Sequence, residues 1–405
     1  MILIVGAGPA GLAVANELRR RGCTYRVLER DSVGTSWLHH YDRLHVHTLK
    51  QISGLPGLPM PPSYPRFPSG RQFQAYLAWY AGRQHLVIET GVEVQRADYD
   101  GSMWHLTTNR GPFAGETVVV ASGIWSTPYR PSFPGEADFQ GSIIHARDYR
   151  NPTPFTGQRV LVVGAGNSGS EIAADLSEHG VETGVTIRGG VAFVPRATSP
   201  TAMRLAAWLL RTLPRTVAGR LLRRRDFSGI GLPRPPGSPL DTFPVVGYDL
   251  PHAVAAGRVA VYRDIERFTA HGVRFADGRE FACDSVILAT GYRPTIQFVA
   301  HELKLDSRGW PRLDRHWRAA GHRHLYCVGF WYPNTEGWLQ SIGRVARITA
   351  RSIAREHGCV GTSSPPHSAV ACGLLSHRAA MLGACIAVAV GGLVVRWWIN
   401  QHEGD

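Results

Sequence analysis

Two glycine-rich segments carry the residue types that bind the pyrophosphate of a dinucleotide. Residues 6–11 read G-A-G-P-A-G and residues 164–169 read G-A-G-N-S-G, so both match the pattern G-x-G-x-x-G. In this pattern the first glycine allows a tight turn, the second lets the backbone approach the phosphates, and the third permits close helix–strand packing. The free amide groups at the start of the next helix would donate to the phosphate oxygens. Two such segments predict two dinucleotide sites in one chain.

The residue that ends the second strand distinguishes the two sites. Glu29 follows the first loop and Arg188 follows the second at nearly the same spacing. A carboxylate accepts hydrogen bonds from ribose hydroxyls and repels a 2′-phosphate, whereas a guanidinium pairs with that phosphate. Arg188 therefore predicts NADPH at the second site, although a surface arginine at a strand end would look the same. A hydride leaving a nicotinamide needs a second carrier, so the Glu29 site is predicted to hold FAD.

The elements around each loop repeat in the same order. In the first unit an apolar strand ends at Gly6, a helix runs over 12–21, and a second strand spans 25–28. In the second unit residues 159–163 form the strand, 171–179 the helix and 184–187 the next strand. This strand–loop–helix–strand order predicts an α/β fold with two Rossmann-like dinucleotide-binding domains.

Composition limits the function classes. The chain has 405 residues, of which 44% are hydrophobic and 19% charged, so two or three folded domains are expected. The six cysteines contain no C-x-x-C pair, which argues against a disulfide scaffold, a zinc ribbon and a dithiol redox enzyme. The formal net charge is +13, yet Lys50 and Lys304 are the only lysines, and such an arginine excess does not predict a nucleic-acid partner. An apolar strand at the N-terminus in place of a signal peptide predicts cytoplasmic enzyme domains.

Further motifs resemble one family. The segment Phe139–Tyr149 fits F-x-G-x-x-x-H-x-x-x-[YF], residues 289–292 read A-T-G-Y, and residues 121–123 are a degenerate copy. With the segment 41–47, these motifs make residues 1–357 similar to the flavin-containing monooxygenases, most closely the plant YUCCA type and its bacterial relatives. The Baeyer–Villiger branch of that family has Trp where this chain has Tyr149.

The resemblance implies a mechanism. NADPH would reduce FAD, oxygen would add at the flavin C(4a) to give a hydroperoxide, and one oxygen atom would pass to a small apolar or aromatic substrate. The other oxygen atom would leave as water. Two alternatives remain open: an NADPH-dependent flavin reductase or oxidase that does not oxygenate, and a non-catalytic flavin-binding interaction protein. Whether the chain forms an oligomer is also open.

The resemblance and the two loops together give the predicted site. His47 occupies the place where animal-type monooxygenases carry an asparagine beside the flavin, which makes it the candidate catalytic residue. His145, in the family motif, is predicted to brace the linker, and the aromatic loop 331–338 is predicted to line a pocket or the domain seam. The predicted cofactor-binding residues are Gly6, Gly8, Pro9, Ala10, Gly11, Glu29, Ser36, Trp37, His47, Thr48, Gly164, Gly166, Asn167, Ser168, Gly169, Ser170, Glu171, Arg188, Ala289, Thr290 and Gly291.

The C-terminal region departs from the family. Residues 379–395 carry no charge and are bounded by Arg378 and Arg396, which predicts a short membrane-spanning helix with the enzyme domains on the cytoplasmic side. A docked apolar helix or a disordered apolar tail is the alternative. The predicted organisation is a split FAD domain (1–157 and 285–357), an inserted NADPH domain (158–284) with a basic helical insert (201–230), a linker (358–376) and a membrane anchor (377–400).

Overall fold

The computed structural model describes most of the first 359 residues. The described residues are 1–197, 199–201, 203, 204, 208, 212, 213, 217, 225–235, 243–330 and 338–359. The predicted anchor 377–400, most of the basic insert, almost all of the linker and the aromatic loop from residue 331 lie outside them. Within the described part of the chain, no helix is both long enough and apolar enough to cross a membrane.

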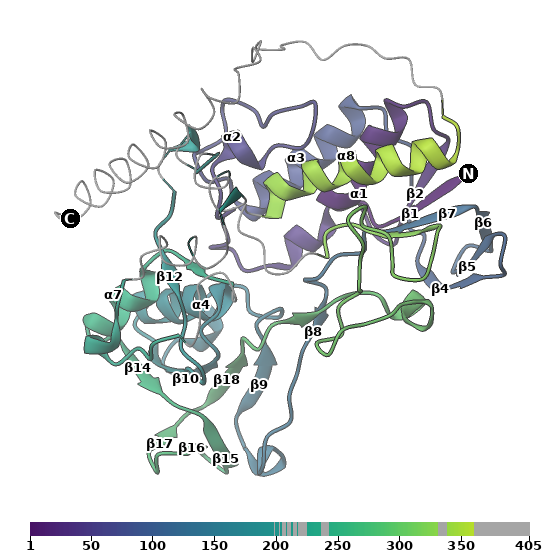
Figure 1. The fold of residues 1–405 in the computed structure, drawn as a ribbon. Helices are drawn as coiled ribbons and strands as arrows, with labels where there is room; N and C mark the ends of the chain where they lie inside the picture. Colours follow the sequence, from purple (N-terminus) through teal and green to yellow (C-terminus); the bar gives the residue numbers. More distant parts are fainter. Residues whose placement is uncertain are drawn as a thin grey trace. The chain divides into compact units, whose positions relative to one another are not determined.

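The first parallel sheet has the strand order β20-β7-β1-β2-β3, and its strands β7, β1 and β2 are labelled in Figure 1. Every neighbouring pair in it runs parallel. Its strands are β1 (Ile2–Val5), β2 (Tyr25–Glu29), β3 (Ile88–Thr90), β7 (Thr117–Val120) and β20 (Leu325–Cys327). The helix α1 (Pro9–Arg19) connects the parallel neighbours β1 and β2.

The second parallel sheet repeats this plan, with the order β14-β11-β10-β18-β9. All of its neighbouring pairs are parallel as well. Its strands are β9 (Ser142–His145), β10 (Arg159–Val163), β11 (Glu182–Thr186), β14 (Val259–Tyr262) and β18 (Ser285–Leu288). The helix α4 (Asn167–Glu178) connects β10 to β11. The α/β fold with two Rossmann-like units is thus confirmed.

Each parallel sheet lies between a helical layer and a small antiparallel sheet. Along β1, Ile2 and Ile4 pack into the core beneath α1, whereas Leu3 and Val5 pack into the opposite core with the antiparallel strands. The same alternation holds in β10, which is buried on both faces. The antiparallel sheets consist of β4 (Val94–Tyr99), β5 (Trp104–Thr108) and β6 (Phe113–Gly115), and of β15 (Ile265–Thr269), β16 (Gly272–Phe275) and β17 (Glu280–Ala282).

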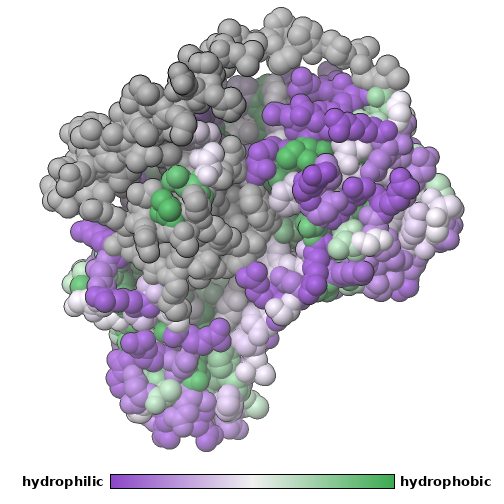
Figure 2. All heavy atoms as spheres, viewed as in Figure 1, coloured by the Kyte–Doolittle hydropathy of each residue, from purple (hydrophilic) through white to green (hydrophobic). Residues whose placement is uncertain are grey.

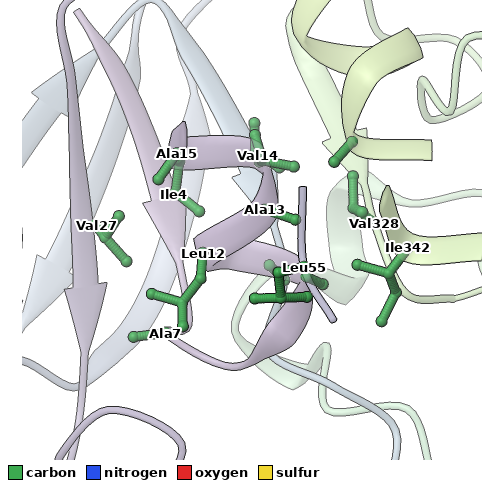
Figure 3. Close-up of a cluster of buried hydrophobic side chains, with 14 of the residues drawn as sticks. Ile4, Ala7, Leu12, Ala13, Val14, Ala15, Val27, Leu55, Val328 and Ile342 are labelled. Atoms are coloured by element: carbon green, nitrogen blue, oxygen red, sulfur yellow. The ribbon is translucent and has the colours of Figure 1, made fainter. Parts of the chain in front are cut away.

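The helix α8 (Trp338–Glu356) closes the helical layer of the first unit by packing along α1 (Figure 1). Figure 3 shows Ile342 of α8, Val328 and Leu55 close to Ala13 and Val14 of α1.

In the view of Figure 2, hydrophilic side chains dominate the surface that the described residues form around this core. Beyond the two sheets and their covers, the described elements are η1 (Thr35–His39), α2 (Lys50–Ser53), α3 (Gly70–Arg83), β8 (Thr127–Pro128), η2 (Glu136–Asp138), η3 (Thr153–Phe155), β12 (Phe193–Val194), η4 (Ser228–Ile230), β13 (Val245–Val246), α7 (Asp249–Ala255), β19 (Tyr292–Arg293) and η5 (Gln297–Glu302).

The strand pairing gives domain boundaries that differ from both predicted ones. β9 and β18 pair with each other in the second sheet, although they were assigned to the FAD domain. The two crossings therefore lie before β9 and after β18, around the antiparallel pair β8 and β19. The sequence could not show this, because a short apolar strand carries no mark of the sheet that it joins.

One cysteine pair also differs from the sequence analysis. Cys23, which follows α1, and Cys359, which follows α8, form a disulfide across 336 positions, with their Cα atoms 5.3 Å apart. The described free cysteines, Cys283 and Cys327, are buried. The absence of C-x-x-C motifs excludes a local dithiol but says nothing of a pair brought together by helix packing.

Candidate active site

The first glycine loop lies at the carboxyl end of β1. Gly6 has φ +107°, a conformation that favours glycine, and a Cβ on Gly11 would lie 1.9 Å from the Gly6 carbonyl oxygen. These two glycines are therefore required by the fold itself. Gly8 caps α1 and Pro9 and Ala10 begin it, so the amides of the first helical turn face the loop.

Glu29 holds the first loop at the end of the neighbouring strand. Its Oε2 accepts a hydrogen bond from the backbone amide of Ala7 at 2.7 Å, and its Oε1 accepts one from the amide of Asp31 at 3.0 Å. Gly34 also donates to the Ala7 carbonyl, so the segment that carries Ser36 and Trp37 begins beside the loop. Trp37 stacks edge-on against Phe73 of α3 at 4.4 Å between ring centroids.

The second glycine loop has the same construction at the end of β10. Gly164 has φ +102°, Gly166 caps α4, and a Cβ on Gly169 would lie 1.9 Å from the Gly164 carbonyl oxygen. The side chain of Asn167 accepts from Val246 N and donates to Pro244 O. The Ser170 hydroxyl donates to the Ala165 carbonyl and is buried. These two side chains shape the loop, which leaves its backbone for a ligand.

The middle glycines provide the test of fit for a dinucleotide. A Cβ added to Gly8 or to Gly166 would meet no protein atom within 4 Å. Each of these glycines thus borders open space directly in front of a helix N-terminus, while the glycines on either side are crowded by backbone. That is the space a pyrophosphate occupies in a dinucleotide site, so the residues fit both predicted cofactors.

The two alanine-glycine motifs support the loops from behind. A Cβ on Gly6 would lie 2.6 Å from the Ala121 carbonyl oxygen, and one on Gly164 would lie 2.8 Å from that of Ala289. Thr290 donates to the Tyr129 carbonyl, and Gly291, at φ +88°, accepts from the Tyr129 amide. The A-T-G-Y motif and its degenerate copy therefore occupy equivalent positions in the two units.

A segment of the first unit, residues 41–47, lies against α4 of the second. Tyr41 donates to Glu171 Oε2 at 2.7 Å, and His47 Nε2 lies 2.8 Å from Glu171 Oε1. Arg43 pairs with Glu178 two turns further along the same helix. The structure thus brings the catalytic candidate His47 and the predicted coenzyme-site residue Glu171 into direct contact. Thr48 instead shares a hydrogen bond with Ser53 at 2.6 Å.

Glu171 is a buried carboxylate with several polar neighbours. Burial alone would raise the pKa of its carboxyl, but the hydrogen bonds from His47 and Tyr41 and the charge of Arg196 lower this pKa below its ordinary value. Burial and the neighbouring Glu171 charge raise the pKa of the Tyr41 hydroxyl well above its ordinary value. Glu171 is therefore ionised and Tyr41 protonated at neutral pH.

Arg188 is exposed just beyond β11 and makes no hydrogen bond or ion pair with any described residue. Arg196, another arginine of this unit, lies 2.9 Å from Asp249 and 4.0 Å from Glu171. Arg263 is also exposed and follows β14, the strand next to β11. The geometry thus leaves Arg188 and Arg263 available to an anion at this edge of the sheet.

Aromatic and basic side chains surround the crossing between the units. Tyr292 contacts His145 at 5.1 Å and the half-exposed Trp125 at 6.0 Å, edge-on in both cases. Burial raises the pKa of Tyr292 to about 12. His145 Nε2 lies 3.1 Å from the Gly291 carbonyl and its Nδ1 accepts from the Arg147 amide, so it braces the linker. Sequence reasoning named Tyr41 only as part of the segment 41–47 and did not select Trp125 or Arg147, because no motif spacing links these side chains to the loops.

Comparisons with known proteins place these features in a family. Residues 3–221 match the family model described as pyridine nucleotide-disulphide oxidoreductase. The rice protein indole-3-pyruvate monooxygenase YUCCA8 (Oryza sativa subsp. indica) is 36% identical over 368 residues, which cover 81% of this chain and 85% of that protein. A flavin-containing monooxygenase from Stenotrophomonas maltophilia superposes with a TM-score of 0.70 at 27% identity, covering 88% of this chain and 98% of that chain. An oxidized steroid monooxygenase bound to NADP shares the fold, with a TM-score of 0.66 at 18% identity, covering 90% of this chain and 87% of that one.

Proposed function

Because this chain belongs to the pyridine nucleotide-disulphide oxidoreductase family, and within it to the YUCCA-type flavin-dependent monooxygenases, we propose that it inserts one oxygen atom of O2 into a small aromatic substrate at the expense of NADPH. The enzyme class and the cofactors FAD and NADPH follow from membership of this family, so those predictions are confirmed. The coupling of NADPH oxidation to oxygenation and the identity of the substrate are the proposal.

The observation that supports the proposal most strongly is the pair of glycine loops of the same construction, in two units that contact each other through residues 41–47 and α4. The Gly6–Gly11 loop with Glu29 would hold FAD, and the Gly164–Gly169 loop with Arg188 would hold NADPH. When bound, FAD supplies the hydride acceptor and the activation of oxygen. The chain's own groups bind the two pyrophosphates, orient the bound groups and exclude water, which suits a reaction that needs few protein acids and bases.

The proposed substrate class is an aromatic 2-oxo acid. The related rice proteins are named for indole-3-pyruvate. In this chain Trp125 and Tyr292 offer aromatic faces at the crossing between the units, and Arg147 and Arg150 offer positive charge near Tyr292. Aromatic rings and a guanidinium are the groups that would recognise such an acid.

The proposal is tested by measuring how much hydrogen peroxide is released for each NADPH that is oxidised. With FAD-loaded protein and indole-3-pyruvate, NADPH oxidation should accelerate and hydrogen peroxide should account for only a minor part of the NADPH consumed. The alternative, an NADPH oxidase without oxygenation, would release about one peroxide per NADPH when the 2-oxo acid is absent, and the acid, which itself consumes free peroxide, would not accelerate NADPH oxidation. A non-catalytic flavoprotein would show no sustained NADPH consumption.

We also propose, from the sequence alone, that the C-terminal apolar stretch tethers the enzyme to the cytoplasmic face of a membrane. Full-length protein should sediment with membranes after a high-salt wash, and protein truncated after Cys359 should not. The truncated protein should keep its flavin, because both predicted loops lie upstream. Recovery of the full-length protein entirely in the supernatant would contradict the anchor.

A further inference from the structure

The contact between Glu171 and His47 crosses from one nucleotide-binding unit to the other. Glu171 lies in the first turns of α4, directly after the second glycine loop, and its side chain is 6% exposed. His47 belongs to the first unit and is 26% exposed. Both Glu171 oxygens are used, one by His47 Nε2 and the other by the Tyr41 hydroxyl. A buried carboxylate therefore accepts two hydrogen bonds from the facing domain.

The donors and acceptors of the two hydrogen bonds determine the protonation states in this contact. The lowered pKa of Glu171 makes it an acceptor at both oxygens, and the Tyr41 hydroxyl, which keeps its proton, donates to one of them. The group opposite the other oxygen must also donate. The hydrogen in the contact therefore belongs to Nε2 of His47. Its Nδ1 makes no hydrogen bond with any described residue, and this atom is not fully buried among the described residues.

The backbone around His47 is fixed independently of Glu171. The Val46 amide donates to the Pro68 carbonyl, the Gly70 amide donates to Leu44, and His45 forms a bridge with Ser69. These bonds leave the imidazole only its side-chain torsions, and Glu171 sets those. Nearby, Arg43 and Glu178 join the same two elements without touching His47, so removal of one contact leaves the other.

We propose that Glu171 is a positioning residue, which holds the imidazole of His47 with its proton on Nε2 and thereby presents Nδ1 as the free, accepting nitrogen of the active site. The proposal rests on the proposed function, since it treats the surroundings of His47 as an active site. A carboxylate in this position also steadies positive charge on the ring when Nδ1 takes up a proton, as buried acids do behind other functional histidines. A contact made only to join the two domains would impose no tautomer.

The test reads the tautomer directly. In full-length, FAD-loaded protein labelled with ¹⁵N-histidine, the His47 resonances are assigned by their loss in His47→Gln, at a pH where the ring is neutral. Nε2 should be protonated and Nδ1 unprotonated, and Glu171→Ala should shift both nitrogens toward a mixture of tautomers. The matched control, Glu178→Ala, should leave both unchanged. A proton on Nδ1 in the wild-type protein would overturn the proposal even if neither variant folded, as would an unchanged spectrum in Glu171→Ala.

Steady-state kinetics separates positioning from coenzyme binding. Glu171→Ala and His47→Ala should each lower kcat by about tenfold or more, and the double variant should lose no more than either single change, because the two side chains act as one unit. The KM for NADPH should stay within about threefold. A raised KM with unchanged kcat would instead make Glu171 a coenzyme contact. The tautomer of His47 is measured without turnover. A failure of the proposed oxygenation would therefore leave the test of the tautomer unaffected.

Discussion

Purified Gly8→Val protein is expected to fold and to be colourless. A Cβ on Gly8 meets no protein atom within 4 Å, so the change should not disturb the first unit. The added side chain would, however, fill the space in front of α1 where the FAD pyrophosphate must lie. Overpacking of this kind costs about 1–3 kcal/mol, which lowers affinity by roughly 5- to 100-fold. The measurement is flavin absorbance per protein after purification, with circular dichroism to confirm the fold.

The second loop supplies the matched control for this experiment. Gly166→Val should remain yellow but lose NADPH binding, because Gly166 occupies the same position in front of α4. Gly11→Ala should behave differently from both, since its Cβ would lie 1.9 Å from a backbone oxygen and the loop itself could not form. Full flavin content in Gly8→Val, or loss of flavin in Gly166→Val alone, would show that the two sites are assigned to the wrong cofactors.

The Arg188→Ala variant is expected to lose its preference for NADPH over NADH. Arg188 is exposed at the end of β11 and pairs with no described residue, so its guanidinium is free for the 2′-phosphate. A charge-assisted contact of this type contributes about 1.5–3 kcal/mol. The ratio of kcat/KM for the two coenzymes should therefore fall by about ten- to a hundredfold.

A control variant makes the Arg188 result interpretable. Arg274→Ala, in the antiparallel sheet of the same unit, removes an arginine that pairs with Glu280 and should leave the coenzyme ratio unchanged. An unchanged ratio in Arg188→Ala would move the assignment to Arg263 at the end of the neighbouring strand. Arg196 is a weaker choice because its guanidinium already pairs with Asp249.

Local features of the fold could be predicted from the sequence because their signals are local. The glycine loops, the strands that lead into them and the helices that follow are contiguous in the chain, so the pattern and the structure agree closely at Gly6–Gly11 and Gly164–Gly169. The helix starts were placed a few residues late. Residues Pro9–Gly11 and Asn167–Gly169 already belong to the helices, although glycine has low helix propensity and proline is favoured only in the first turn.

The contacts that assemble the site depend on residues far apart in the sequence. Tyr41 and His47 meet Glu171 across more than a hundred positions, and nothing in their spacing indicates it. The same limit explains the strands β9 and β18, whose sheet is decided by pairing, and the disulfide of Cys23 with Cys359, which results from α8 packing along α1. Glu171 was selected from the sequence only as part of the coenzyme loop.

Labelled oxygen tests the central claim, NADPH-driven oxygenation, most directly. The FAD-loaded enzyme would be supplied with NADPH, ¹⁸O₂, catalase and indole-3-pyruvate, with a panel of further aromatic 2-oxo acids in parallel, and the products analysed by mass spectrometry. Catalase is present because free hydrogen peroxide oxidises a 2-oxo acid without an enzyme and would itself transfer the label. We expect one ¹⁸O atom in the organic product, with one product formed per NADPH oxidised. NADPH consumption with no label in any organic product would contradict the proposal.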